Sequence, residues 1–443
     1  MTIAADPQEV SRPRRVAPPP VTTSRGGGPT DPSHDAELRR GIIHTAVSRP
    51  LAMGLLGAFL FIIYGIPLAQ AVLEKVKGDD SMLPDLFKRR PTRENLKQFE
   101  EDLDKASYFK DAVQPRVQLA LTRLGAGNKR AVVGRGGWLF YQPGVLSLAG
   151  PGFLDQDTQR SRVRAAEDEG LPPIHPDPRP AVLAFQRALG ARGIRLVLFP
   201  VPDKGALQPA ELHGRVRRAG EVPVATNRDY PRFVQEMRAA GVLVYDPAPP
   251  ALHPGEPPRF LEQDTHWTPA WMEAVAAGLA ALVRENVPLP AAPAPRWQTV
   301  LTPVQRVGDI VDMLKLPETQ TLFPARSITV RQVKDDKGAP WEPKPGADVL
   351  LLGDSFTNVF TLGQMGWGEA AGLAPHLAIA LGREVDVIAQ NDSGAFATRK
   401  LLAEALAAGE DRLAGKKVVI WELASRELAV GDWKPYDYPG AAR

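Results

Sequence analysis

The longest apolar stretch of the chain lies close to its N-terminus. Residues 50–73 contain no charged side chain, and a helix of this length can cross about 30 Å of hydrocarbon. Arginines precede the stretch and several acidic residues follow it, so the positive-inside rule places the N-terminus in the cytoplasm and the rest of the chain outside. We therefore expect a transmembrane anchor over residues 49–73. A cleaved signal peptide is the alternative, because Ala69-Gln70-Ala71 has the small-x-small form of a cleavage site.

The segments that flank this stretch have different patterns. Residues 1–48 contain a proline triplet and a glycine run but almost no large apolar side chains, so they cannot bury enough surface to offset the entropy of ordering. We expect them to form a disordered cytoplasmic tail. Residues 74–130 are rich in charged residues and mainly helical in pattern, which predicts a helical linker that leads into a globular domain.

From residue 131 onward, short apolar runs alternate with segments of helix length. Strands are predicted at 194–199, 242–245, 349–352, 385–388 and 418–421, and helices at 181–189, 230–240 and 269–284. Thr268 and Pro269 are expected to begin the last helix as its N-cap and first helical residue. Mostly apolar strands separated by helices indicate an α/β fold whose parallel sheet is covered on both faces. We assign this domain to residues 131–430 and expect the C-terminal tail, residues 431–443, to pack loosely.

Composition excludes several classes of function. The hydrophobic fraction of 44% and the charged fraction of 24% are those of an ordinary globular protein. A net charge of +3, without dense basic runs, gives no indication of nucleic-acid binding. The absence of cysteine removes disulfides, thiolate nucleophiles and cysteine-based zinc sites, and it fits an oxidising compartment.

A serine follows one of the predicted buried strands. The strand at 349–352 runs into Gly353-Asp354-Ser355, and glycine allows the tight bend that projects a serine hydroxyl from the carboxyl edge of a parallel sheet. In that position the Ser355 N–H can serve as an oxyanion donor. Turns at strand ends often contain these three residue types for conformational reasons alone, so a catalytic serine also requires a base elsewhere in the chain.

His266 has the most informative surroundings of the seven histidines. Asp264 lies two residues before it, and in an extended backbone the two side chains point to the same side. A carboxylate on Nδ1–H fixes the tautomer and leaves Nε2 free to accept the serine proton. Helix capping and metal binding are the alternatives, but no second histidine or carboxylate cluster has ligand spacing nearby. We predict a catalytic triad of Ser355, His266 and Asp264 that needs neither a metal ion nor a cofactor.

Together these motifs resemble the alginate O-acetyltransferase family, the AlgX/AlgJ-like proteins, in which the acid and the histidine also precede Gly-Asp-Ser. Asp-x-His-Trp at 264–267 is part of the resemblance. Four further segments also resemble the family: 137–140, 200–204, 308–314 and 419–426. The resemblance covers about residues 131–430 and implies a three-layer, SGNH-hydrolase-like domain with a mostly parallel sheet. In the last segment, we interpret Glu422 and Arg426 as an ion pair at a strand end.

The resemblance also implies a function and partners. It implies transfer of an acetyl group to hydroxyls of an exopolysaccharide acceptor, of which alginate is the best known. A membrane-bound O-acyltransferase is the implied donor partner, because it would pass acetyl groups outward. With the predicted anchor, the chain is expected to be a single-pass protein of the inner membrane whose catalytic domain lies in the periplasm. No carbohydrate-binding module is apparent after residue 430, which favours the anchored members of the family.

Four further residues are candidates for the oxyanion hole or for substrate binding, and each has a structural alternative. Asn391 either donates a second oxyanion hydrogen bond or belongs to a turn. Arg399 either binds an anionic sugar or is a solvated surface residue. Trp267 is either a sugar-stacking platform or core packing, and Lys204 either lines the acceptor groove or caps a helix.

We therefore hypothesise a two-step reaction through an acetyl-serine intermediate. An acetylesterase of the same fold would use the same triad, with water as the acceptor. A non-catalytic polysaccharide-binding scaffold is a third alternative, against which the intact triad argues.

Overall fold

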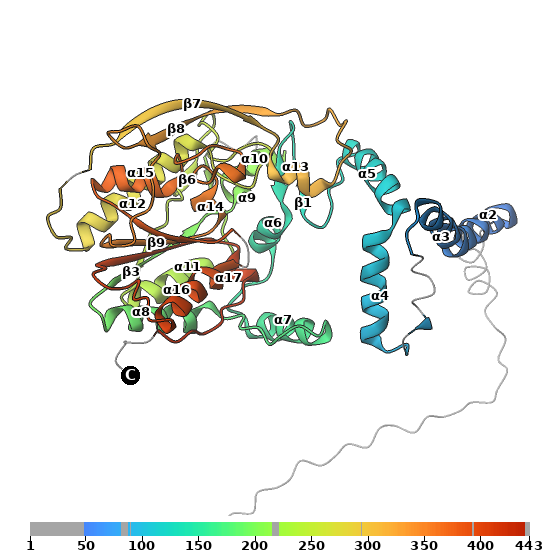
Figure 1. The fold of residues 1–443 in the computed structure, drawn as a ribbon, viewed down its shortest axis with the longest axis horizontal. Coiled ribbons are helices and arrows are strands. Elements are labelled where there is room, and N and C mark those ends of the chain that lie inside the picture. The colour runs from blue at the N-terminus through green and yellow to red at the C-terminus, as the bar shows by residue number, and fades with distance from the viewer. Residues whose placement is uncertain are drawn as a thin grey trace, which may run out of the picture. The chain divides into compact units, whose positions relative to one another are not determined.

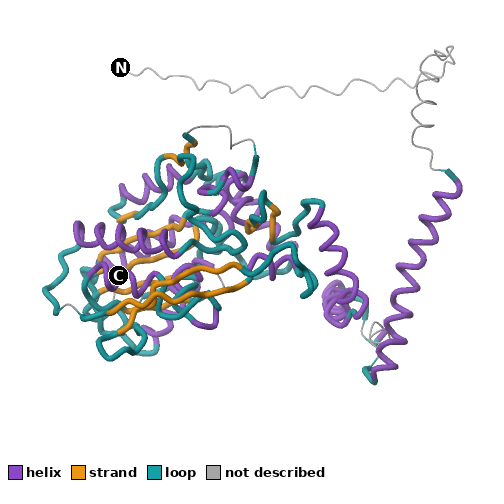
Figure 2. Tube along the Cα trace, turned by 90° about the horizontal axis from the view of Figure 1, so that it is seen from above, coloured by secondary structure: helices purple, strands orange, loops and turns teal. Residues whose placement is uncertain are grey.

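The computed structural model describes residues 48–80, 87–88, 90–214, 221–293, 295–391 and 394–438. The chain divides into two compact units, Met1–Phe109 and Lys110–Arg443. The predicted disordered tail lies outside the described residues apart from Ser48. Figure 2 shows the distribution of helices and strands along the trace.

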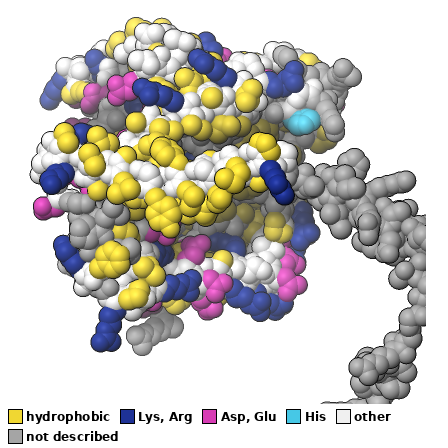
Figure 3. Space-filling model, turned by 90° about the vertical axis from the view of Figure 1, so that its right-hand side faces the viewer, with side chains coloured by type: hydrophobic (Ala, Val, Ile, Leu, Met, Phe, Trp, Pro, Cys, Tyr) yellow, Lys and Arg dark blue, Asp and Glu magenta, His cyan; other side chains and the backbone are white. Residues whose placement is uncertain are grey.

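The first unit contains the predicted anchor as one long helix. It consists of α2 (Arg49–Leu60), the π-helical turn η1 (Phe61–Gly65) and α3 (Ile66–Lys77). These 29 residues have a mean hydropathy of 2.2 in their most apolar window, which is enough to cross a membrane. Most of their apolar side chains are exposed, and exposed hydrophobic side chains are also frequent on the face shown in Figure 3. The helix α4 (Arg93–Ala106) follows within the segment that the sequence predicted to be mainly helical, and Thr92 is its N-cap.

The second unit is built on a five-stranded parallel sheet with strand order β10-β9-β11-β3-β5. Its strands are β3 (Arg195–Val201), β5 (Leu243–Val244), β9 (Val349–Gly353), β10 (Asp386–Ala389) and β11 (Val418–Ala424). All five strands predicted from the sequence are present in this sheet. The two strands β9 and β11 are buried along their whole length, because helices cover both faces of the sheet.

Helices on both faces give the unit three layers (Figure 1). One face carries α12 (Pro269–Asn286) and α15 (Leu373–Leu381), and the other carries α8 (Pro178–Gly190), α11 (Tyr230–Ala239) and α16 (Ala397–Ala407). Successive side chains of a strand point to opposite faces, so Val349 and Leu351 join the core beneath α12, whereas Leu350 and Leu352 join the core beneath α8. The three-layer α/β fold expected from the sequence is confirmed.

Smaller elements complete the unit. The hairpin of β1 (Ala131–Val133) and β2 (Leu139–Tyr141) begins the domain. A long antiparallel ribbon is formed by β7 (Gln298–Arg306) and β8 (Arg326–Lys334), and the helix α13 (Asp309–Leu314) lies between its strands in the sequence. Buried side chains of α13 share a small core with β1 and β2. The other α-helices of the described residues are α5 (Tyr108–Arg123), α6 (Gln142–Ala149), α7 (Gln156–Asp168), α9 (Lys204–Leu207), α10 (Pro209–Leu212), α14 (Ser355–Asn358) and α17 (Glu427–Val430).

The C-terminal segment packs tightly, and the prediction of loose packing is wrong for residues 431–438. Trp433 is 1% exposed, its ring lies 5.6 Å from that of Trp421, and its Nε1 donates to the Glu427 carbonyl at 3.1 Å. The ring of Tyr438 lies 4.8 Å from that of Phe185 on α8. The prediction failed because the segment is polar on average, while its aromatic rings reach the core individually.

We expect Trp433→Ala to lower the free energy of unfolding by about 3–5 kcal/mol, because it leaves a large cavity in a closed aromatic cluster. Urea unfolding of the detergent-solubilised chain, followed by far-UV circular dichroism, measures this change. Val430→Ala, at a position that is 46% exposed, is the control and should change stability by less than about 0.5–1 kcal/mol. Equal effects of the two substitutions would contradict a structural role for the C-terminal segment.

Candidate active site

The nucleophile turn begins where β9 ends at the carboxyl edge of the sheet. Ser355 is the first residue of α14, and the Asp354 carboxylate caps this helix by accepting from the Phe356 N–H at 2.8 Å. A Cβ at Gly353 would lie 2.1 Å from Thr357 Oγ1, so the turn can be this tight only with glycine. Asp354 Oδ2 also accepts from the Ala424 N–H at 3.0 Å, which ties the turn to the end of β11. The short helix therefore projects Ser355 from the sheet edge, as the sequence predicted.

The loop that carries the acid and the histidine is closed on itself. The Leu261 N–H donates to the His266 carbonyl at 3.0 Å, and the Thr268 N–H donates to the Arg259 carbonyl at 2.9 Å. Thr268 then caps α12 through the Trp271 N–H, which confirms the predicted N-cap. This closure holds the backbone from residue 261 to residue 266 in one conformation just before a long helix.

The three predicted residues form one hydrogen-bonded chain. His266 Nδ1–H donates to Asp264 Oδ1 at 2.6 Å, since an ionised carboxylate can only accept. On the other side of the ring, Ser355 Oγ–H donates to His266 Nε2 at 2.8 Å. The acid therefore orients the imidazole, and the free nitrogen lone pair faces the serine proton.

The electrostatics of the pair favour an ionised acid and a strong base. Burial alone would raise the pKa of Asp264, but the hydrogen bond and the charge of His266 outweigh it, and the pKa of Asp264 is lowered. The Trp367 Nε1–H, which donates to Asp264 Oδ2 at 2.8 Å, acts in the same direction. Burial would lower the pKa of His266, but the hydrogen bond and charge of Asp264 raise it above its ordinary value. His266 is therefore suited to accept a proton and later return it.

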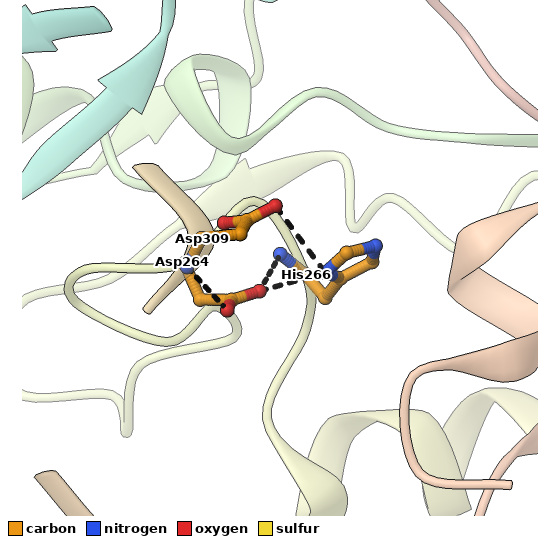
Figure 4. A group of neighbouring side chains, drawn as sticks. All are labelled: Asp264, His266 and Asp309. Carbon is orange, nitrogen blue, oxygen red and sulfur yellow. Dashed lines mark hydrogen bonds and ion pairs between the residues drawn. The ribbon is translucent and has the colours of Figure 1, made fainter. Parts of the chain in front are cut away.

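A second carboxylate, Asp309 on α13, lies beside this pair (Figure 4). Within the described residues, Asp264, His266 and Asp309 form the one group of such side chains close enough to hold a metal ion, with ligand atoms within 4.8 Å of one another. Sequence spacing did not indicate this cluster, because Asp309 is 45 residues from Asp264. A metal ion bound to Nδ1 would need the lone pair of that nitrogen. In this structure Nδ1 carries a hydrogen that is directed at Asp264, so it has no lone pair to offer. The expectation of a metal-free site stays a prediction, which this hydrogen bonding supports.

The two predicted oxyanion donors, the Ser355 N–H and Asn391, differ in their contacts. No acceptor among the described residues binds the Ser355 N–H, so this donor is available to a substrate oxygen. Asn391 is exposed beyond the end of β10, and its Oδ1 accepts from Asn358 Nδ2 at 2.7 Å. The Gln390 N–H also donates to the Gly353 carbonyl at 3.0 Å, so the segment before Asn391 is tied to the nucleophile turn.

The other three predicted binding residues are buried. Trp267 is 0% exposed, and its ring packs 5.1 Å from that of Phe356 in the core, which leaves no open face for a sugar. Arg399 is 1% exposed on α16, donates to the Lys434 carbonyl at 3.1 Å, and lies 4.8 Å from the Trp421 ring. It therefore holds the C-terminal segment and is not a solvated surface residue.

Lys204 supports the loop that carries Asp264 and His266. It is 6% exposed, and its ammonium donates to four backbone carbonyls at 2.6 to 3.0 Å, those of Leu139, Leu261, Glu262 and Asp264. Burial lowers the pKa of Lys204 to about 7, against the opposing charges of nearby carboxylates. Its contacts are those of a residue that fixes the loop, since the ammonium protons are directed at protein carbonyls.

Glu422 is a functional candidate that the sequence did not indicate. It is 1% exposed at the end of β11, and its Oε2 accepts from the Asp354 N–H at 2.9 Å and from Thr357 Oγ–H at 2.8 Å. The predicted ion pair with Arg426 is wrong, because Arg426 approaches Glu427 instead, at 4.0 Å. Burial and the neighbouring Asp354 charge raise the pKa of Glu422 well above its ordinary value, which favours the protonated form of this carboxyl. The sequence did contain one indication of this role, because Glu422 is the one charged residue in the apolar strand β11.

The sequence of this chain is similar to those of known proteins. A family model described as SGNH hydrolase-like domain, acetyltransferase AlgX, matches residues 131–425. A probable alginate O-acetylase AlgJ from Pseudomonas aeruginosa is 32% identical over 183 residues, which are 39% of this chain and 44% of that protein. A probable alginate O-acetylase AlgJ from Pseudomonas fluorescens is 28% identical over 276 residues, which are 57% and 61% of the two chains. The chain thus spans less than two thirds of the length of these relatives.

Two solved structures are also similar. The O-acetyltransferase domain of Pseudomonas putida AlgJ matches with a TM-score of 0.47 and 20% identity, over 68% of this chain and 93% of that chain. Pseudomonas aeruginosa AlgX matches with a TM-score of 0.47 and 16% identity, over 70% of this chain and 63% of that chain.

The role of Glu422 can be tested through its charge state. Because the folded chain binds the Glu422 proton more tightly than the unfolded chain, wild-type stability should fall as the pH rises above about 4.3. Glu422→Gln is neutral at every pH, so its unfolding free energy relative to wild type should rise as the pH increases above about 4.3. Urea unfolding at several pH values measures this difference.

Glu422→Ala is the matched variant for the hydrogen bonds. It leaves the Asp354 N–H and the Thr357 hydroxyl without their acceptor, at a cost of about 1–3 kcal/mol each. We expect it to be less stable than Glu422→Gln at every pH. Equal stability of the two variants, or a pH-independent difference between Gln and wild type, would show that Glu422 is not a neutral clamp.

Proposed function

Because this chain belongs to the SGNH hydrolase-like acetyltransferase family of AlgX, we propose that it transfers acetyl groups through a serine acyl-enzyme to hydroxyls of an exopolysaccharide such as alginate. The observation that carries the proposal is the unbroken hydrogen-bonded chain from Asp264 through His266 to Ser355. The names of the AlgJ relatives support acetylation of alginate as the reaction class.

The reaction has two steps, each with balanced proton transfer. Ser355 Oγ attacks the donor acetyl carbonyl while His266 Nε2 accepts the hydroxyl proton, and the Ser355 N–H stabilises the oxyanion. The tetrahedral intermediate collapses, the bond to the donor group breaks, and His266 returns the proton to that group. A sugar hydroxyl then attacks the acetyl-serine while His266 Nε2 accepts the hydroxyl proton. The bond between Ser355 Oγ and the acyl carbon breaks, and His266 returns the proton to Oγ, which regenerates free Ser355.

Family membership favours transfer over hydrolysis. Water would complete the same second step in an acetylesterase, so the triad alone supports both reactions. What supports transfer here is the match of a family model of acetyltransferases over residues 131–425. The acceptor is then a polymer hydroxyl that reaches Ser355 at the carboxyl edge of the sheet.

The proposed location is the inner membrane, with the catalytic domain in the periplasm. Gln70 near the end of the anchor helix is 4% exposed, donates to the Ala106 carbonyl at 2.7 Å and accepts from the Tyr108 N–H at 3.0 Å. Lys77 lies 3.5 Å from the centre of the Tyr108 ring. Cleavage after Ala71 would remove Gln70 from these partners, which favours a retained anchor over a signal peptide. A membrane-bound O-acyltransferase in the same membrane is the proposed acetyl donor partner.

Ser355→Ala should lower acetyl transfer by at least about 10³-fold, because the variant cannot form the acyl-enzyme. The assay incubates the detergent-solubilised chain with 4-nitrophenyl acetate and oligomannuronate and measures acetylated sugar by mass spectrometry. Ser327→Ala, at an exposed position on β8, is the matched control and should keep wild-type activity. Sugar acetylation that survives in Ser355→Ala would reject the mechanism. Release of acetate without acetylated sugar in the wild type would identify an esterase.

We expect the mature protein to keep its N-terminal helix. After fractionation, the intact chain should remain in carbonate-washed membranes, and its measured mass should include the residues before position 72. A soluble periplasmic product that starts at Val72 would instead establish the signal-peptide alternative.

A further inference from the structure

The short helix α13 is pressed against the loop that carries the acid and the histidine. Gly308, which precedes the helix, has no room for a side chain, since a Cβ there would lie 2.2 Å from the Gln263 carbonyl oxygen. The Ile310 N–H donates to this carbonyl at 3.3 Å. The buried face of α13 packs on the β1–β2 hairpin through Ile310, Val311 and Leu314. The first residue of α13 is therefore held beside the loop by both packing and hydrogen bonding.

That first residue, Asp309, lies against Asp264, Thr265 and His266 of the loop. Its backbone N–H donates to Asp264 Oδ2 at 3.0 Å, and its Oδ1 accepts from the Thr265 N–H at 2.7 Å. Its other oxygen lies 4.0 Å from His266 Nδ1. Figure 4 shows the two carboxylates beside the imidazole, one from the loop and one from α13.

We propose that Asp309 is a second positioning carboxylate for His266, which fixes the loop by its hydrogen bonds and adds a negative charge on the Nδ1 side of the ring. This inference rests on the proposed function, because it concerns the base of that reaction. Asp309 is not assigned to direct contact with substrate, and it acts only through Asp264 and His266.

Asp309 differs from Asp264 in its access to solvent. The Asp309 side chain is 29% exposed, whereas that of Asp264 is 2% exposed. Burial and the charge of Asp264 raise the pKa of Asp309 to about 6. The charge of Asp309 is therefore present at neutral pH and is lost on mild acidification, while Asp264 stays ionised.

The other charged groups around the imidazole do not duplicate this position. Asp354 faces His266 from the nucleophile turn, and Lys204 opposes the carboxylates from α9. Asp312 lies further along α13, and burial, more than the charge of Asp264, raises its pKa; Glu422 lies behind Asp354, and its pKa is raised by burial and by the Asp354 charge. Of these groups, Asp309 alone combines a hydrogen bond to the loop backbone with a 4.0 Å approach to Nδ1.

Two substitutions separate the charge of Asp309 from its hydrogen bonds. Asp309→Asn keeps an acceptor for the Thr265 N–H and the backbone bond to Asp264, but it removes the charge. Asp309→Ala removes both the charge and the acceptor. Asp312→Asn is the matched control, because Asp312 lies on the same helix with a side chain that is 67% exposed.

The experiment measures kcat/KM for hydrolysis of 4-nitrophenyl acetate by the full detergent-solubilised chain from about pH 5 to about pH 9. Loss of the Asp309 charge makes protonated His266 less favourable, so the acidic limb of the Asp309→Asn profile should move to lower pH by about 0.5–1 unit. Asp309→Ala should show the same shift and also a roughly 10-fold or greater loss of kcat, since the loop is no longer held. Asp312→Asn should follow the wild-type profile.

An acidic limb that stays in place in Asp309→Asn, with circular dichroism unchanged, would overturn the proposal and leave Asp309 as a packing residue. Equal losses of activity in the Asn and Ala variants, without a shift of the limb, would overturn it as well. Ser355→Ala is measured in parallel: if it hydrolyses the ester at the wild-type rate, the proposed function itself fails. Loss of activity in Ser355→Ala with no shift in Asp309→Asn rejects only the role of Asp309.

Discussion

A buried negative charge is the constraint around which the site is organised. Asp264 is 1% exposed, and an ionised carboxylate at such a position is stable only if donors surround it. Its four donors are the backbone N–H and Nδ1–H of His266, the Asp309 N–H, and the Trp367 Nε1–H. These donors come from three segments of the chain. Solvating one carboxylate therefore fixes the positions of the histidine loop, of α13 and of the loop that carries Trp367.

The nucleophile turn also packs against a buried carboxyl group, that of Glu422, but here the pKa is raised and not lowered. Asp354 and Glu422 lie together near the ends of β9 and β11, and two neighbouring carboxylates, of which Glu422 is fully buried and Asp354 half-buried, cannot both be ionised at little cost. The raised pKa of Glu422 resolves this, because its neutral carboxyl still accepts from Asp354 N–H and Thr357 Oγ–H. The Asp354 side chain serves as helix cap, and the Glu422 carboxyl serves as clamp for the Asp354 N–H and the Thr357 hydroxyl. Two carboxyl groups with different hydrogen-bonding roles thus hold the turn that carries Ser355.

The sequence could predict those parts of the site that are local in the chain. The apolar strand before Gly353 and the two-residue spacing of Asp264 and His266 both encode their geometry within a few residues, and the five strands of the sheet followed from their apolar runs. Asp309, Glu422 and Trp367 reach the site across 45 to 103 residues, so only the fold brings them there. The sequence left the roles of Lys204, Trp267 and Arg399 undecided for a related reason. A polar or aromatic residue within a motif can serve either the substrate or the protein, and burial decides which one it serves.

The division between buried supports and exposed surface bears on how transfer differs from hydrolysis. The ammonium of Lys204, the carboxylate of Asp264 and the carboxyl of Glu422 are all directed at protein groups among the described residues. In the proposed mechanism they set the reactivity of Ser355 equally for water and for a sugar, because neither acceptor touches them. In that mechanism, selection of the acceptor depends on exposed groups outside this buried network, such as Asn391, whose Oδ1 accepts from Asn358 of the nucleophile helix α14. A family with this arrangement of buried groups can then change its acceptor by substitutions at exposed residues around the serine, while its buried hydrogen-bond network stays the same.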